Sequence, residues 1–171
     1  IIQLDSKGNF MGYIGAPKVQ TDFFTLLLRK FFTKAQKEQL QQFVPTEYNS
    51  IFIDNEDFIW STISSLKEDD ISNSIKSHDK SGKVTPIRKI NSMGNDILKR
   101  NGTYAPMGDL YFNTDPSRIV DVAVGSNGIY SLLDQTKGRV FTYDVEGNLL
   151  YVWGNIGYKK SDFQLPIAIR Y

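Results

Sequence analysis

Short runs of alternating apolar and polar residues recur along the chain, and tight turns separate them. The run 5–10 contains a Gly-Asn pair, and the run 144–149 repeats it with the same spacing at an offset of 139. A weaker copy lies at 91–95. Alternation interrupted by a Gly-Asn pair is the pattern of a β-hairpin, so these runs predict three related hairpins.

A second type of hairpin precedes the later two copies. The residues from 51 onward match those from 122 onward at an offset of 71, and 166–169 begins a further copy. Each unit therefore contains four short strands, A to D, in which A–B is one hairpin and C–D is the other. The A–B pair repeats at 71 but the C–D pair at 53, so the earlier unit carries about 18 extra residues between B and C, over 66–83.

Tandem four-stranded units with glycine-containing turns predict a mainly β fold and are typical of a β-propeller. A parallel β-helix or a β-sandwich is the structural alternative. Both ends of the chain lie inside predicted strands, so we expect a piece of a longer chain whose exposed strand edges promote self-association. The expected parts are the C–D strands of one blade (1–15), a helical insertion (16–48), a blade (49–102, with the insertion 66–83), a second blade (117–154) and the start of another (163–171).

The stretch 134–149 combines an Asp, an Arg followed by an aliphatic residue, and an Asp-x-x-Gly turn, and in this it resembles an NHL repeat. Lys137-Gly138 stand where the family usually has Asn before the Arg. The resemblance is good over 117–154 and partial over 49–102 and 1–15. It implies a six-bladed propeller of the NHL or gluconolactonase-like type, of which this chain would cover under half. The chain is also similar to NHL-containing surface proteins of Gram-positive bacteria.

The long connections of the expected blades all belong to one face. A propeller places its A–B and C–D turns on one face and its B–C and D–A connections on the other. The A–B and C–D turns are short, whereas the long segments 16–48, 66–83 and 103–117 are B–C or D–A connections. Binding residues concentrate on loops held by a rigid scaffold. We therefore expect the loop-elaborated face to engage a protein, peptide or glycan.

The first insertion predicts two helices near 21–43. Thr21-Asp22 can cap an apolar helix, and 33–36 is a capping box that opens a polar one. The helices either pack over the propeller or form a partner-docking hairpin or lid, while the lack of a clean basic face disfavours binding to a membrane surface. The candidate binding residues are Phe23, Phe31, Glu47, Tyr48 and Arg118.

Composition removes several chemistries without naming one. Twenty Lys and Arg against 19 Asp and Glu give a net charge of +1, which disfavours DNA and also RNA, although some NHL propellers bind RNA. The absence of cysteine excludes disulfides, thiolate zinc sites and a cysteine nucleophile, and the single histidine, His78, excludes multi-histidine metal sites. No stretch is apolar for long enough to span a membrane.

The resemblance implies a second class of function, a divalent-metal-dependent hydrolase or lyase. Gluconolactonase-like propellers hold one cation with Glu, Asn and Asp side chains from different blades, a donor set that suits calcium, and the metal polarises a lactone carbonyl. The candidate ligands are Glu47, Asn49 and Asp121. The structural interpretation has Glu47 and Asp121 capping loops or pairing with Arg118.

The residues favour the non-enzymatic scaffold over the metal enzyme. Asp134 and Arg139 are expected to tie neighbouring strands or blades together, and no catalytic residue is assigned. Apart from calcium in the alternative, no cofactor is expected. The absence of cysteine, the polar loops and the resemblance together favour an extracellular or surface-anchored bacterial protein.

Overall fold

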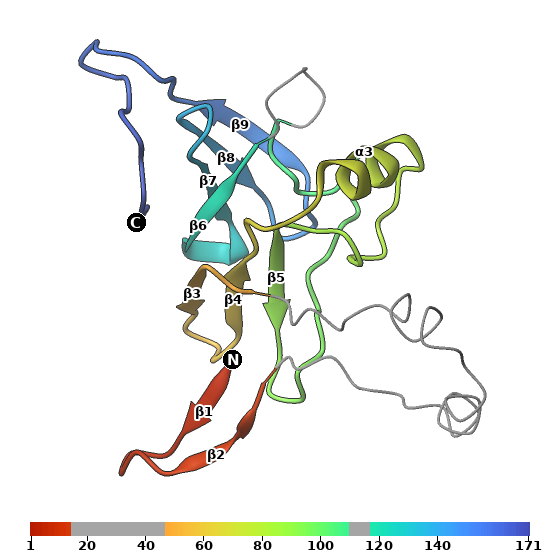
Figure 1. Ribbon diagram of the computed structural model, residues 1–171, viewed down its shortest axis with the longest axis vertical. Helices are drawn as coiled ribbons and strands as arrows, with labels where there is room; N and C mark the ends of the chain where they lie inside the picture. The colour runs from red at the N-terminus through yellow and green to blue at the C-terminus, as the bar shows by residue number, and fades with distance from the viewer. Residues whose placement is uncertain (15–46, 110–116) are drawn as a thin grey trace, which may run out of the picture. The chain divides into compact units, whose positions relative to one another are not determined.

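The computed structural model describes residues 1–14, 47–109 and 117–171 (Figure 1). The chain divides into two compact units, Ile1–Thr46 and Glu47–Tyr171, and each is treated by itself. In the described part the fold is mainly β, as predicted, with antiparallel sheets of two, three and four strands and one short α-helix. The predicted helical insertion near 21–43 lies outside the described residues, together with Phe23 and Phe31.

The first unit contains a single described hairpin. Strand β1 (Ile2–Leu4) pairs antiparallel with β2 (Phe10–Tyr13). One oxygen of Asp5, Oδ1, accepts hydrogen bonds from the backbone N–H groups of Lys7 and Asn9, both at 2.8 Å. This side-chain cap on the turn is the local device that closes the hairpin.

The same cap recurs in the second unit. An Asp or Asn at the first turn position accepts hydrogen bonds from the backbone N–H groups two and four residues further along the chain. In three of the four turns the fourth position is a glycine with φ between 80° and 85°, a conformation that favours glycine. The first residues of the four turns are Asp5, Asp54, Asn91 and Asp144. The predicted repeat of tight turns is therefore confirmed.

The four-stranded sheet of the second unit matches the predicted second blade. It has the order β6-β7-β8-β9, with every neighbouring pair antiparallel. Because the named strands pair antiparallel, the parallel β-helix alternative is wrong for the described chain. Its strands are β6 (Ile119–Val124), β7 (Tyr130–Asp134), β8 (Arg139–Tyr143) and β9 (Leu149–Trp153), and the 3-10 turn Ser126–Gly128 links β6 to β7.

The other sheet of this unit has three strands rather than the predicted four. Its order is β3 (Ser50–Ile53), β4 (Ile59–Thr62), β5 (Ile87–Ile90). The expected fourth strand is reduced to an isolated bridge between Ile90 and Asp96.

The side chain of Arg100 explains this loss. Its Nη2 donates to the backbone oxygen of Ile87 in β5 at 3.2 Å, and its Nη1 donates to the backbone oxygen of Leu98 at 2.9 Å. Nη2 also pairs with Asp96 at 2.7 Å. The buried guanidinium thus bonds a β5 carbonyl to which a fourth strand would donate its N–H groups.

The insertion 66–83 contains helix α3 (Glu68–Lys76), which the polar composition of this stretch did not predict. Ile71 and Ile75 lie four residues apart on one face, and Ile71 is buried. Two apolar residues at helical spacing give the helix its packed side, while most of its sequence stays polar. No helix in the described ranges is both long and apolar enough to cross a membrane.

The two sheets of the second unit share one core. Trp60 of β4 and Tyr130 of β7 meet between the two sheets, and their ring centroids lie 4.9 Å apart. The ring of Tyr130 in turn stacks on that of Tyr143 in β8, with centroids 5.4 Å apart. The buried cluster comprises Trp60, Ile87, Leu98, Ile119, Val122, Tyr130, Leu132, Phe141 and Tyr143.

The expected start of a further blade, 163–171, contains no named strand. It nevertheless contacts the four-stranded sheet. The backbone N–H of Ile169 donates to Asp121 of β6 at 2.8 Å, and the Tyr171 hydroxyl lies 2.7 Å from that of Ser131 on β7. One face of the sheet is thereby bonded to this C-terminal segment.

Candidate functional site

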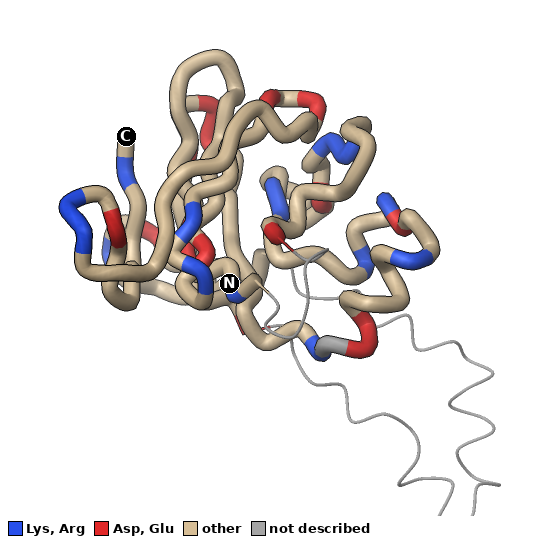
Figure 2. The backbone as a smooth tube through the Cα atoms, turned by 90° about the horizontal axis from the view of Figure 1, so that it is seen from above, with Lys and Arg blue, Asp and Glu red and all other residues tan. Residues whose placement is uncertain are grey.

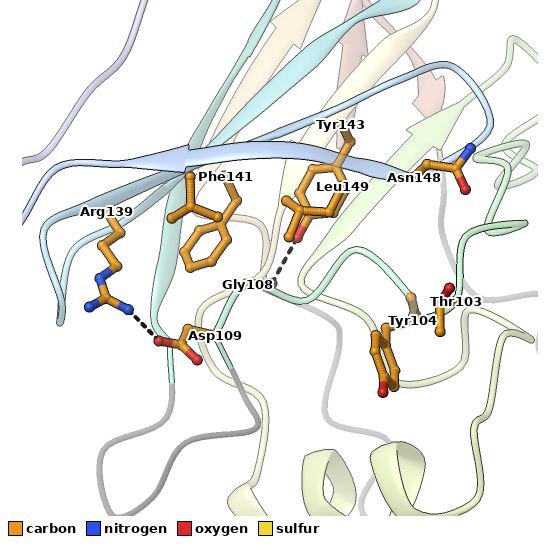
Figure 3. A pocket seen from close by; sticks show the side chains of 11 residues that line it. Thr103, Tyr104, Gly108, Asp109, Arg139, Phe141, Tyr143, Asn148 and Leu149 are labelled. Carbon is orange, nitrogen blue, oxygen red and sulfur yellow. Dashed lines mark hydrogen bonds and ion pairs between the residues drawn. The ribbon is translucent and has the colours of Figure 1, made fainter.

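A pocket of about 590 Å³ opens beside strands β8 and β9 of the four-stranded sheet (Figure 3). One wall is the connection 103–109 and the other is the face of β8 and β9. The residues that line it are Thr103, Tyr104, Ala105, Gly108, Asp109, Arg139, Phe141, Tyr143, Asn148, Leu149 and Val152.

The strand register builds the apolar side of the pocket. Phe141 of β8 lies opposite Val152 of β9, and Tyr143 lies opposite Leu149. Directly opposed residues in an antiparallel pair project from the same face, so these four side chains share one surface. Phe141 and Tyr143 are buried in the shared core, whereas Leu149 and Val152 are 52% and 40% exposed. The rigid sheet therefore offers accessible apolar side chains to the pocket.

An ion pair forms the polar end of the pocket. Nη1 of Arg139 lies 2.6 Å from Oδ2 of Asp109, and Nζ of Lys137 lies 3.7 Å from the same oxygen. The Asp109 side chain is 8% exposed, whereas that of Arg139 is 40% exposed. The guanidinium is thus fixed by a buried carboxylate while part of it stays open to a ligand.

A chain of hydrogen bonds fixes Asp109. Its backbone N–H donates to Oγ of Ser117 at 2.8 Å, and Ser117 donates to Oδ2 of Asp134 at 2.5 Å. The other oxygen of Asp134 accepts the backbone N–H groups of Arg118 and Thr136. Asp134 is fully buried in this network. Asp134 and Arg139 were predicted to tie neighbouring strands or blades together. Asp134 bonds the residues that directly precede β6, whereas Arg139 pairs with Asp109 of the connection 103–109 and lines the pocket.

Gly108 lets the connection 103–109 approach the sheet closely. It has φ of 74°, and a Cβ at this position would lie 2.9 Å from Oγ of Ser117. Its N–H donates to the hydroxyl of Tyr143 at 3.3 Å, which fastens the loop to β8. Figure 3 shows this bond and the Asp109–Arg139 pair on the two sides of the pocket.

The wall 103–109 is attached to the other elaborated segment. The Tyr104 ring stacks on His78, which follows α3, with centroids 6.1 Å apart. Nζ of Lys80 donates to the backbone oxygen of Gly102 at 2.5 Å. Two of the long connections expected to share a face, 66–83 and 103–117, therefore meet in their described parts.

The described residues among the candidate binding positions do not line this pocket. Glu47 is exposed, and Tyr48 is half-buried with a hydroxyl that no residue of the described ranges bonds. Arg118 is exposed, and its Nη1 donates to the side-chain oxygen of Gln135 at 3.2 Å.

The structural interpretation had Asp121 capping a loop or pairing with Arg118; the pairing is wrong, whereas Asp121 does cap the C-terminal segment and pairs with Arg170. Its Oδ2 lies 2.6 Å from Nη1 of Arg170 and also accepts the N–H of Ile169, while its Oδ1 accepts the hydroxyl of Ser50. The Asp121 side chain is 3% exposed, so both oxygens are enclosed by these donors. The partner of Asp121 was missed because Arg170 follows it by 49 residues and carries no motif.

The candidate metal ligands do not form a set that fits a cation. Both oxygens of Asp121 already accept protein hydrogen bonds, and Asn49 donates its Nδ2 to the backbone oxygen of Val120 at 2.6 Å. Calcium needs several oxygen ligands free to converge on it. Within 1–14, 47–109 and 117–171 there is no group of three or more His, Cys, Asp or Glu placed to hold a metal. We therefore derive no metal-dependent step.

A second hollow of about 510 Å³ lies between the short turns 54–56 and 125–128. Lys89 lines this hollow. Its Nζ lies 3.4 Å from Oδ2 of Asp54 and 4.3 Å from the centroid of the Phe58 ring. Burial alone would raise the pKa of Asp54, but hydrogen bonds from Trp60 and the backbone, with the charge of Lys89, lower it overall. The charges of Asp54 and Lys89 in this hollow thus compensate each other, and we assign the hollow no ligand.

Sequence reasoning missed most of the pocket. Phe141 and Tyr143 alternate along one strand, and this signal indicated a packed face without indicating that its outer end stays open.

The comparisons supply no further guide to function. No protein-family model matches the chain, and no curated protein matches it significantly.

Proposed function

We propose that the chain is a non-enzymatic binding scaffold built on NHL-like propeller blades, and that the pocket beside β8 and β9 binds part of a protein, peptide or glycan. Contacts between equivalent positions of the two repeats support the blade arrangement, because rotation about a propeller axis brings such positions together. The hydrogen bond between Ser50 and Asp121, which are 71 residues apart, is one of these. We place the protein on the surface of a bacterium because of the absence of cysteine, the polar loops and the resemblance together.

The observation that carries the proposal is the composition and support of the pocket. It combines exposed aliphatic side chains on a sheet, Leu149 and Val152, with a fixed Asp109–Arg139 pair at one end. Ligand sites are typically concave and mostly apolar, with a few polar groups that set orientation. One wall comes from a connection on the elaborated side, which is where the sequence placed binding.

The charge distribution does not favour nucleic acid as the ligand. Figure 2 shows Lys and Arg interspersed with Asp and Glu along the described chain, and the whole chain carries a net charge of +1. Nucleic-acid binding needs a basic face that neutralises several phosphates. We therefore propose an uncharged or weakly charged partner.

The test is a selection on the immobilised 171-residue chain with two defined probes, a displayed library of random peptides and a glycan array. At least one peptide or glycan should bind, and Val152→Glu should weaken that binding by about tenfold or more, because it places a charge on the apolar wall. The matched control is Met93→Glu, which adds the same charge at a side chain that is 74% exposed in the turn after β5. It should bind as the unmodified chain does.

Two outcomes would overturn the proposal. In the first, neither probe gives a binder. In the second, the binders respond equally to Val152→Glu and Met93→Glu. Both variants are first checked for an unchanged thermal midpoint, so that loss of binding is not loss of fold.

A further inference from the structure

The edge of the four-stranded sheet next to the pocket is open. Strand β9 is the last in the order β6-β7-β8-β9, and among the described strands it pairs with β8 alone. The backbone N–H and C=O groups on its far side therefore have no ladder partner. Such an edge is a template for pairing with another extended chain.

The edge also lacks the usual protection against pairing. Edge strands are commonly guarded by charged residues, prolines or bulges. Strand β9 has the sequence Leu-Leu-Tyr-Val-Trp, without charge or proline, and each of its residues is 40% to 54% exposed. A register shift leaves Leu150 without a partner on β8, so one bulge lies near the start of the strand. The rest of the edge, Tyr151–Trp153, is regular.

The neighbouring repeat shows what a covered edge looks like in this chain. There the far side of β5 is bonded by the chain itself. The Ile97 N–H donates to the backbone oxygen of Lys89 at 2.7 Å, and Arg100 donates to that of Ile87. No such bond reaches the far side of β9 from any described residue. Of the two compared strands, β5 and β9, only β9 therefore keeps an open edge among the described residues.

We propose that the site takes an extended peptide, which adds to the free edge of β9 and places one apolar side chain in the pocket. The inference rests on the proposed function and names its ligand class. Side chains of an added strand alternate between the two faces of the sheet. On the pocket face they would continue the surface formed by Phe141, Leu149 and Val152.

The pocket favours a peptide over a second copy of this chain. The partly exposed Arg139 guanidinium offers donors to the pocket, and the side-chain oxygen of Asn148, whose nitrogen is bonded to Asp144, offers an acceptor. A peptide presents matching carbonyl and amide groups around each apolar side chain. Pairing of two β9 strands would instead place next to this polar rim a strand, Leu149–Trp153, that has no charged or amide side chain to bond it.

The experiment uses the tightest peptide from the displayed library and two N-methylated versions of it. Each version carries N-methyl groups along one edge only, which removes the donors of that edge and leaves every side chain in place. One version should lose binding by about tenfold or more, and the other should bind nearly unchanged. Amide hydrogen exchange of the 171-residue chain should slow within 149–153 when the unmodified peptide is bound.

The outcomes separate this inference from the proposed function. If Val152→Glu abolishes binding but neither N-methylated version is impaired, the pocket binds a side chain and strand addition is overturned. If only glycans are selected, the pocket function stands and the peptide inference is again overturned. If exchange in 149–153 slows with rising chain concentration and no peptide present, a second copy occupies the edge and the inference is wrong.

Discussion

The hydroxyl of Ser50 donates a hydrogen bond to the carboxylate of Asp121, and the two residues are separated by 71 positions, the offset of the A–B repeat. They are therefore equivalent residues of consecutive units. Asn49 reaches Val120 with the same separation. Because both contacts join residues that are 71 positions apart, β3 and β6 lie side by side with their equivalent residues at the same level. Rotation about a common axis generates this relation, and it supports the proposed propeller arrangement.

Asp121 should be the most sensitive polar residue of this junction. Asp121→Ala removes the acceptor of Ser50, of the Ile169 N–H and of Arg170. Because the Arg170 side chain is 56% exposed, its ion pair adds little, and the lost buried hydrogen bonds should cost about 2 kcal/mol in the free energy of unfolding. Ser50→Ala should cost about 1 kcal/mol, and the double variant less than the sum. Urea denaturation measures all three.

The control for this junction is Arg118→Ala. Arg118 is exposed and contacts Gln135 rather than Asp121, so its loss should change the free energy of unfolding by less than about 0.5 kcal/mol. Equal losses for Arg118→Ala and Asp121→Ala would contradict the assigned pairing.

The turn after β8 should make the chain less stable in acid. The Asn148 side chain, followed by backbone N–H groups of Asn148, Glu146 and Gly147, lowers the pKa of Asp144 below its ordinary value of 3.8. The charged carboxylate therefore contributes stability above pH 3.8, and this contribution is lost as the pH falls through the lower folded-state pKa.

Asn148→Ala should raise the pKa of Asp144 towards 3.8, as seen in a carboxyl-carbon NMR titration. The matching turn of the first unit supplies the control. There Asn9 is the largest cause of the lowered pKa of Asp5. Asn9→Ala should move the Asp5 titration and leave that of Asp144 in place. A common response of both carboxylates to either substitution would refute the local cause.

The sequence predicted what depends on neighbouring residues and missed what depends on distant ones. Turns such as that of Asp144 are closed by side chains two to four residues away, so their pattern is visible in the sequence. The same holds for the four strands of 117–154. Helix α3 was missed because only Ile71 and Ile75 mark its packed face within a polar stretch.

The pocket and the missing fourth strand arise from long-range contacts. Arg100 bonds Ile87, 13 residues earlier, and this substitutes for strand pairing. Asp109 meets Arg139 across 30 residues, and neither position belongs to a motif for binding. Such contacts follow from how the two sheets pack, and no local pattern in the sequence specifies them.

Arg100 should be irreplaceable by lysine. Arg100→Met removes one donor each from Asp96 and from the backbone oxygens of Ile87 and Leu98, in a site where the arginine is only 8% exposed, and should cost about 3 kcal/mol. Arg100→Lys should recover only part of this, since a single ammonium cannot reach the three acceptors that the planar guanidinium bonds. Urea denaturation followed by tryptophan fluorescence gives the values.

Lys99→Met is the matched comparison for Arg100. The neighbouring Lys99 pairs with Glu146, and both side chains are well exposed, at 55% and 39%. Its removal should cost less than about 1 kcal/mol. If Lys99→Met were as destabilising as Arg100→Met, the guanidinium would not be closing the edge of β5.

Tyr130→Phe should leave the protein as stable as before or raise its free energy of unfolding by about 1 kcal/mol. The Tyr130 ring is fully buried against Trp60, but its hydroxyl is buried without a hydrogen-bond partner among the described residues, and this burial raises the pKa of the phenol above its ordinary value. Phenylalanine keeps the ring and removes the unsatisfied group. Trp60→Ala, which empties the other side of the same contact, should cost about 3–5 kcal/mol. Thermal unfolding of both variants decides the matter: a clear loss in Tyr130→Phe would mean that the hydroxyl has a partner in solution, and would make this part of the core a polar junction between the sheets.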